Sequence, residues 1–153
     1  MKDELFLMDT NILVYAYDKT EREKHRICRE LVAKCWNLET EYAISLQNIS
    51  EFYLIITKKV ENPVPLKDAR SIVKDIINFK CWKKINFTQN TIISAININK
   101  RYKIRYWDAL LIATMRENNV FCIYTENESD FKKIRWLDVI NPLSDKILDK
   151  KHH

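Results

Sequence analysis

Glycine is absent from the chain of 153 residues. Phosphate-binding loops of the Walker and Rossmann types need glycine, because their tight turns bring the backbone close to the phosphate groups and leave no room for a side chain. The sequence therefore excludes nucleotide binding through either kind of loop.

Long apolar runs are also absent. No stretch approaches the roughly 20 consecutive apolar residues of a membrane-spanning helix, and Met1 to Glu4 lack the charged-then-apolar pattern that opens a signal peptide. We therefore expect a cytoplasmic protein. The length suits one domain with a hydrophobic core, which we assign to residues 1–143. Residues 144–153 form a C-terminal tail, in which His152 and His153 are either native or left by a purification tag.

Cysteine spacings typical of zinc sites are missing. No C-x-x-C pair occurs among the four cysteines, so we expect buried, reduced thiols; they are Cys28, Cys35, Cys81 and Cys122. The net charge of +5 is modest, but the basic residues gather in clusters. Any one cluster alone is more typical of a solvated surface than of a binding site.

The spacing of apolar residues predicts alternating strands and helices. Short apolar runs predict strands at residues 5–8, 42–46, 84–87, 121–124 and 138–140. Helical spacing predicts helices at residues 25–36, 48–59, 68–79, 91–100 and 107–118, with another after the first strand. This alternation indicates an α/β fold, a three-layer α/β/α sandwich with a mostly parallel sheet of about five strands.

Acidic residues follow two of the predicted strands. Asp9 comes directly after the first strand, and Glu126 and Asp130 come after the fourth. Parallel α/β sheets bind ligands outside the carboxyl ends of their strands, so we expect these acids at one edge of the sheet. Taken alone, Asp9 with Thr10 and Asn11 suits a helix cap equally well.

Two further acids lie within predicted helices. Glu51 is one turn before Leu54 and Ile55, and Asp108 shares a helical stripe with Leu111. A carboxylate on a buried face needs a cation or hydrogen-bond donors to offset its desolvation, which favours a ligand role. An isolated Asp in the first turn of a helix is also favourable through the helix dipole, so the case for Asp108 depends on the other acids.

These acids together predict a metal site. They would converge with no histidine and no obviously paired lysine among them, and like charges that close cannot all ionise without a partner. Mg²⁺ or Mn²⁺ suits an all-oxygen site, and one or two such ions serve phosphodiester hydrolysis by an activated water.

A polyanionic substrate would fit the segment that precedes Asp108. Its basic residues offer phosphate contacts, and its aromatic residues offer stacking faces for single-stranded bases. The predicted RNA-binding residues are Lys100, Arg101, Lys103, Arg105 and Trp107.

Four motifs of the chain resemble those of the PIN-domain family and occur in the same order. They are residues 6–13, Ser50-Glu51-Phe52, Trp107-Asp108-Ala109 and residues 124–131. The resemblance implies that Asp9, Glu51 and Asp108 are catalytic acids that hold the metal, and that Thr10 and Asn11 support them.

The fourth acid of the family pattern stays open. Some relatives have Asp two residues after the motif threonine, Thr125, where this chain has Asn127. The role then passes to Asp130, which matches an alternative pattern of the family, or to Glu126. Thr125 and Asn127 would be supporting polar residues.

The resemblance also implies an activity. In size the chain is similar to VapC-type toxins of this family. This similarity implies a Mg²⁺- or Mn²⁺-dependent endoribonuclease that acts on RNA in the cytoplasm. It also implies a homodimer that is silenced by an antitoxin protein. The alternative is a non-catalytic RNA-binding or RNA-processing assembly module that kept only the fold. A dehalogenase-like phosphatase would need Asp at the position of Asn11, and a phosphoacceptor of the receiver type would have no use for Glu51.

Overall fold

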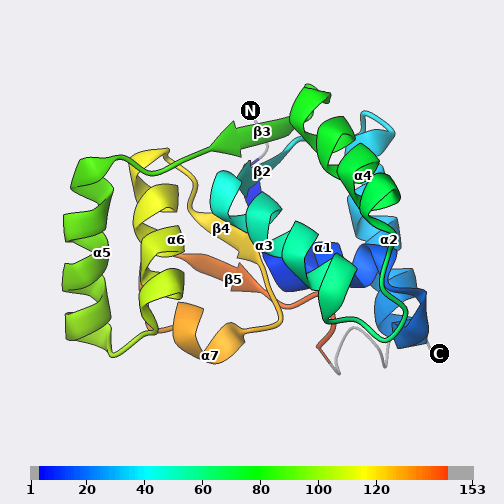
Figure 1. Cartoon of the computed structure of the whole chain (residues 1–153). Helices are drawn as coiled ribbons and strands as arrows, with labels where there is room; N and C mark the ends of the chain where they lie inside the picture. The colour runs from blue at the N-terminus through cyan, green and yellow to red at the C-terminus, as the bar shows by residue number, and fades with distance from the viewer. Residues whose placement is uncertain (1–3, 145–153) are drawn as a thin grey trace.

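The computed structural model of the protein describes residues 4–144, and they form three layers with helices on both faces of a central sheet (Figure 1). Its strands are β1 (Phe6–Met8), β2 (Tyr42–Ser45), β3 (Trp82–Ile85), β4 (Cys122–Tyr124) and β5 (Asp138–Ile140). All of them pair in parallel, in the order β3-β2-β1-β4-β5. The predicted α/β/α sandwich is therefore confirmed.

One or more helices lie between each strand and the next along the chain. They are α1 (Thr10–Tyr17), α2 (Arg22–Trp36), α3 (Leu46–Lys58), α4 (Leu66–Asn78), α5 (Gln89–Tyr102), α6 (Tyr106–Glu117) and α7 (Glu128–Phe131), with a short 3₁₀ turn at Lys19–Glu21. Figure 1 shows α5 and α6 side by side at one end of the molecule and α1 to α4 gathered at the other.

Two apolar cores lie on opposite faces of the sheet, because successive side chains of a strand point to opposite sides. On β1, Met8 packs with residues of α1 to α4, whereas Leu7 packs with the apolar stripe of α6 and with Phe131 of α7. Both side chains are fully buried. Strands covered on both faces explain why the first strand is a continuous apolar run.

Two elements differ from the sequence-based predictions. Strand β3 begins at Trp82, two residues before the predicted start, because the fully buried Trp82 pairs with Tyr42 and the exposed Phe87 lies beyond the strand. Helix α7 was not predicted, since its four residues are too few to show a helical period. The other predicted strands and helices are present with ends shifted by a few residues.

All four cysteines are buried and free, as predicted. Burial raises the pKa of the Cys28, Cys35 and Cys122 thiols to about 12, which keeps them neutral. None of the helices between residues 4 and 144 is long and apolar enough to cross a membrane. Of the predicted tail, residues 145–153, with His152 and His153, lie outside the described residues.

Candidate functional site

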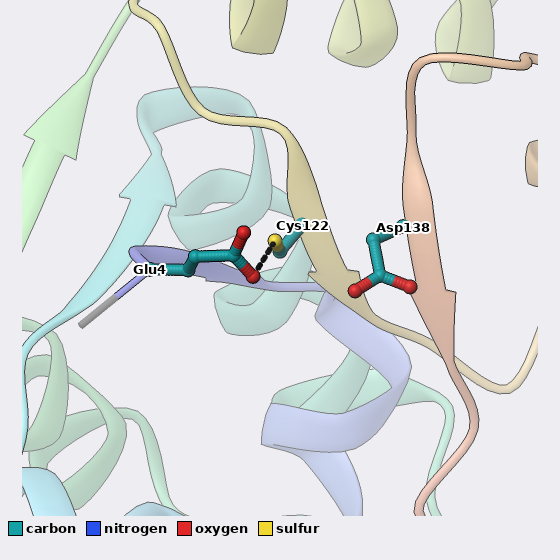
Figure 2. A group of neighbouring side chains, drawn as sticks. All are labelled: Glu4, Cys122 and Asp138. Atoms are coloured by element: carbon teal, nitrogen blue, oxygen red, sulfur yellow. Dashed lines mark hydrogen bonds between the residues drawn. The ribbon is translucent and has the colours of Figure 1, made fainter.

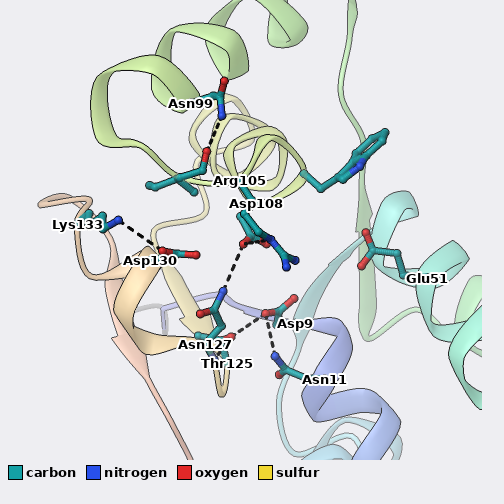
Figure 3. A network of polar contacts seen from close by, with 12 residues as sticks. Asp9, Asn11, Glu51, Asn99, Arg105, Asp108, Thr125, Asn127, Asp130 and Lys133 are labelled. Atoms are coloured by element: carbon teal, nitrogen blue, oxygen red, sulfur yellow. Dashed lines mark hydrogen bonds and ion pairs between the residues drawn. The ribbon is translucent and has the colours of Figure 1, made fainter. Parts of the chain in front are cut away.

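Asp9 is both a helix cap and the centre of a polar cluster at the carboxyl edge of the sheet (Figure 3). It directly follows β1, and its Oδ1 accepts a hydrogen bond of 2.8 Å from the backbone N–H of Thr10. Its Oδ2 accepts one of 2.7 Å from Thr125 Oγ1 and a longer one of 3.4 Å from Asn11 Nδ2. The sequence leaves two interpretations of Asp9 open, a helix cap and a site residue, and the structure shows that they are compatible.

Burial raises the pKa of Asp9 to about 6. The hydrogen bonds from Thr125 and from the Thr10 backbone partly oppose this effect, while the charges of Asp108 and Glu51 add to it. Within residues 4–144, no cationic side chain forms an ion pair with Asp9. Asp9 is therefore a desolvated carboxylate that lies among other acids and lacks a compensating charge.

Glu51 reaches the same edge from the second turn of α3. Its Oε2 accepts a hydrogen bond of 3.1 Å from Thr10 Oγ1, and its Oε1 accepts one of 3.0 Å from Gln47 Nε2. The prediction that Glu51 lies on a buried apolar face is wrong in part, because Leu54 is 45% exposed. Glu51 sits at the rim of the core rather than inside it.

Asp108 lies in the first turn of α6 and is half-buried. Asn127 Nδ2 donates to its Oδ2 at 3.3 Å, and Arg105 Nε lies 3.7 Å from the same oxygen. Burial raises the pKa of Asp108, Arg105 opposes this, and the charges of Asp130 and Glu51 raise it further. The predicted stripe with Leu111 is buried along its length.

The two candidates for the fourth acid point in different directions. Asp130 interacts with Asp108 through its charge and lies 3.5 Å from Lys133 Nζ. Glu126 instead accepts a hydrogen bond of 2.7 Å from Tyr15 and forms an ion pair of 3.0 Å with Lys24. The structure thus brings Asp130, and not Glu126, toward Asp108.

Lysines pair with two of the predicted acids, contrary to the expectation that none would. Lys24 neutralises Glu126, and Lys133 lies beside Asp130. The expectation holds for Asp9, Glu51 and Asp108 among the described residues, although Asp108 has an arginine, Arg105, 3.7 Å away. Sequence separation hides the first pair, since Lys24 and Glu126 meet only through the fold, whereas Lys133 follows Asp130 by three residues.

The predicted supporting residues all bind the acids or one another. Thr125 Oγ1 donates to Asp9 and accepts the backbone N–H of Asn127 at 3.0 Å. Asn11 Oδ1 accepts the backbone N–H of Glu126 at 3.3 Å. These bonds fix the segment after β4 against the start of α1, so that residues from both ends of the chain share one cluster (Figure 3).

Two polar residues of the cluster were missed by sequence reasoning. Asn48 is buried and donates to Thr10 Oγ1 at 2.9 Å, and Gln47 Nε2 donates to Glu51 and, at 3.1 Å, to the backbone oxygen of Trp107. A signal existed for each. Ser45 and Asn48 form a capping box at the start of α3, and Gln47 precedes Glu51 by one helical turn.

The carboxylates of this cluster interact electrostatically but do not converge tightly. Within residues 4–144, the group of three acid, thiol or imidazole ligands whose atoms all lie within 4.8 Å of one another is Glu4, Cys122 and Asp138 (Figure 2). These three lie at the opposite edge, where β4 and β5 begin. Cys122 Sγ donates a hydrogen bond to Glu4 there, at 3.2 Å.

The predicted RNA-binding residues lie on the surface beside Asp108. Lys100 and Arg101 end α5, Lys103 occupies the turn that follows in a left-handed conformation, and Arg105 precedes α6. All four are exposed, and Trp107 is 60% exposed. This basic and aromatic surface meets the acidic cluster at Arg105, which lies 3.7 Å from Asp108.

Comparisons with known proteins agree with this architecture. A family model described as PIN domain matches residues 6–137. The fold is similar to that of a toxin–antitoxin complex from Klebsiella pneumoniae, with 23% identity, a TM-score of 0.63 and coverage of 91% of this chain and 98% of that one. A comparison with curated proteins gives no match.

Two further solved structures share the fold. VapBC2 from Rickettsia felis, bound to a DNA fragment from its promoter, is 20% identical, with a TM-score of 0.62 and coverage of 90% of this chain and 98% of that one. VapC20 from Mycobacterium tuberculosis, a toxin that cleaves the Sarcin-Ricin loop, is 13% identical, with a TM-score of 0.63 and coverage of 82% and 92%.

Proposed function

Because the chain belongs to the PIN-domain family, we propose that it is a metal-dependent endoribonuclease that hydrolyses phosphodiester bonds of RNA. The observation that carries this proposal is the gathering of Asp9, Glu51, Asp108 and Asp130 at the carboxyl edge of the sheet, with charges that act on one another. We assign the activity to residues 1–143.

The acids suit a hard divalent cation. Asp9 is buried without a compensating charge and is repelled by two other carboxylates. The four acids offer only carboxylate oxygens as metal ligands. Asp9, Glu51, Asp108 and Asp130 would hold one or two Mg²⁺ or Mn²⁺ ions. When bound, such an ion lowers the pKa of water and stabilises negative charge on phosphoryl oxygens.

The remaining side chains of the cluster orient the acids. Thr125 and Asn11 fix the carboxylate of Asp9, and Asn127 fixes that of Asp108. Arg105 is exposed and lies 3.7 Å from Asp108, where its outer nitrogens would meet a phosphate of the substrate. In this proposal Glu126 is a structural residue, held by Tyr15 and Lys24 on the far side of its loop.

We further propose that the enzyme is the toxin of a toxin–antitoxin pair and acts in the cytoplasm. The similar structures support the toxin assignment, since they are toxins or toxin–antitoxin complexes. An antitoxin protein would then be its partner. A homodimer is supported by three exposed isoleucines on one side of α5, namely Ile92, Ile93 and Ile96.

One observation favours a second candidate, a non-catalytic RNA-binding module. Asp9, Glu51 and Asp108 do not come within 4.8 Å of one another as a group, whereas Glu4, Cys122 and Asp138 do. If the acids kept this spacing with a metal present, they would serve only to shape an RNA-binding surface.

Cleavage of a labelled single-stranded RNA by purified protein distinguishes the two. We expect cleavage with Mg²⁺ or Mn²⁺, none in EDTA, and a loss of at least about 100-fold in Asp9→Asn and Asp108→Asn, since losing a ligand costs more than losing its hydrogen-bonding partner. Asp68→Asn is the matched control, because Asp68 also lies in the first turn of a helix but is exposed on α4. Equal cleavage by Asp9→Asn, or cleavage undiminished in EDTA, contradicts the proposal.

A further inference from the structure

A groove of about 460 Å³ runs between α5, α6 and the segment that leads from α7 to β5. It lies apart from the acidic cluster, and none of the four acids lines it. Its lining includes Arg101 and Tyr102 from α5, Arg116 and Glu117 from α6, and Trp136. Figure 1 shows the two helices next to each other along their length.

Both arginines of the groove rest on aromatic rings. The guanidinium of Arg116 lies 6.0 Å from the ring centre of Trp136, and that of Arg101 lies 5.3 Å from the ring centre of Tyr102. Each pair combines a positive charge with flat faces on which another planar group can stack.

Neither arginine is neutralised by an acid of the described chain. The carboxylate in the groove, Glu117, accepts a hydrogen bond from Thr91 instead. Two unpaired guanidinium groups leave the groove positive, and guanidinium is well shaped to bind phosphate. The groove therefore suits a ligand that carries both phosphates and planar rings.

A basic segment leads from the groove toward the proposed active site. Arg101 lies in the groove and belongs to the basic segment that ends at Arg105, 3.7 Å from Asp108. Helix α6 carries Asp108 in its first turn and Arg116 near its end. These two residues are about 12 Å apart along the helix axis, at 1.5 Å per residue. A single strand of RNA that runs from Asp108 past Arg105 would reach Arg116 within a few nucleotides.

We infer that this groove binds the single-stranded RNA that flanks the bond to be cut. Arg101 and Arg116 contact its phosphates, and Trp136 and Tyr102 pack against its bases. The inference rests on the proposed function and adds a binding site for substrate outside the acidic cluster. Contacts of this kind are tolerant of sequence, because every base has a flat face.

Binding of fluorescently labelled RNA in EDTA tests the groove without cleavage. For an RNA of about 12 nucleotides, we expect Arg116→Gln to weaken binding several-fold and to lower the slope of log K against log salt by about 0.7, the value for one lost phosphate contact on a single strand. Arg116→Lys keeps the charge and should keep most of the slope. Arg70→Gln, an exposed arginine on α4, should change neither.

A salt slope unchanged in both Arg116→Gln and Arg101→Gln overturns the inference, and so does a groove that binds an acidic peptide in preference to RNA. The proposed function is judged separately, by metal-dependent cleavage in wild type. Metal-dependent cleavage together with an unchanged salt slope in both arginine variants would therefore refute RNA binding in the groove but not the proposed nuclease activity.

Discussion

Asp9 shows how one residue can serve the fold and the site together. As the cap of α1 it satisfies a backbone donor that would otherwise be unpaired. As a buried acid near Glu51 and Asp108 it is costly to ionise. The hydrogen bonds from Thr125 and Thr10 reduce this cost but do not remove it, because the pKa stays raised.

This raised pKa predicts how stability depends on pH without metal. The folded pKa of Asp9 is about 6 and the ordinary value is 3.8, so the folded state binds the proton more tightly than the unfolded chain. The contribution of Asp9 is therefore fully present below pH 3.8 and is lost as the pH rises through 6. Relative to wild type, Asp9→Asn should gain up to about 3 kcal/mol between pH 4 and pH 7.

Urea unfolding in EDTA at pH 4, 5, 6 and 7 measures this gain. The difference between the two proteins should grow with pH and then level off above about pH 7. Thr125→Val is a useful comparison, because it removes a donor to the ionised carboxylate and should make the loss of stability larger and extend it to higher pH. Parallel pH curves for wild type and Asp9→Asn would show that Asp9 keeps an ordinary pKa.

Single residues also mark where sequence reasoning ends. The rule that ligands gather beyond strand ends places Asp9, Glu126 and Asp130 at the correct edge. It does not say to which side of a loop a side chain turns. Glu126 turns toward α1 and α2 because it binds Tyr15 and Lys24 there, and both partners are distant in sequence.

Helix ends are the elements most affected by the lack of glycine. Helix α2 ends in a Schellman motif, with Glu39 N–H bonded to Lys34 O at 2.8 Å and Leu38 N–H bonded to Cys35 O at 3.1 Å. Leu38 has φ of 65°, the left-handed conformation in which glycine is preferred. Helix α6 ends similarly, but with Asn119 at φ of 57°.

We therefore expect Leu38→Gly to raise the free energy of unfolding by about 1 kcal/mol, because a side chain with a Cβ atom is strained in this conformation. Leu38 is 61% exposed, so little packing is lost. Asn119→Gly is the matched control and should gain less, since Asn tolerates the left-handed region. Differential scanning calorimetry measures both, and a lower melting temperature for Leu38→Gly contradicts the prediction.

Elements with long, regular patterns were predictable from the sequence, and short ones were not. Helices α2, α3 and α6 have apolar stripes of several turns, which fix their type and place their ends within a few residues. The predicted range of strand β3 begins two residues too late, because the position of this strand depends on the pairing of Trp82 with Tyr42, which no local pattern encodes. Helix α7 depends on its packing of Phe131 into the core.

At the scale of the whole molecule, α5 presents two different surfaces. One of its sides lines the arginine groove, and another exposes Ile92, Ile93 and Ile96, of which Ile93 is 62% exposed. Exposed apolar residues on one side of a helix are typical of a contact between proteins. We propose a second copy of this chain as the occupant.

If so, Ile93→Glu should convert a dimer to a monomer, because a buried unpaired carboxylate destabilises an apolar interface by several kcal/mol. Light scattering coupled to size-exclusion chromatography should then show the mass fall by half. Ile77→Glu is the matched control, since Ile77 is 48% exposed on α4. A wild type that is monomeric at high micromolar concentration, or an Ile93→Glu variant that stays dimeric, contradicts this assignment.

The order of the strands has a consequence for the time at which the site forms during synthesis. Strand β1 pairs with β4, and Thr125 binds Asp9 across 116 residues of sequence. A ribosome-bound chain therefore carries Asp9 and Glu51 early but cannot complete their surroundings until α6 and β4 have emerged. In the proposed nuclease, the message and the ribosome that are making the chain are therefore safe from cleavage until β4 and Thr125 have emerged and folded onto β1.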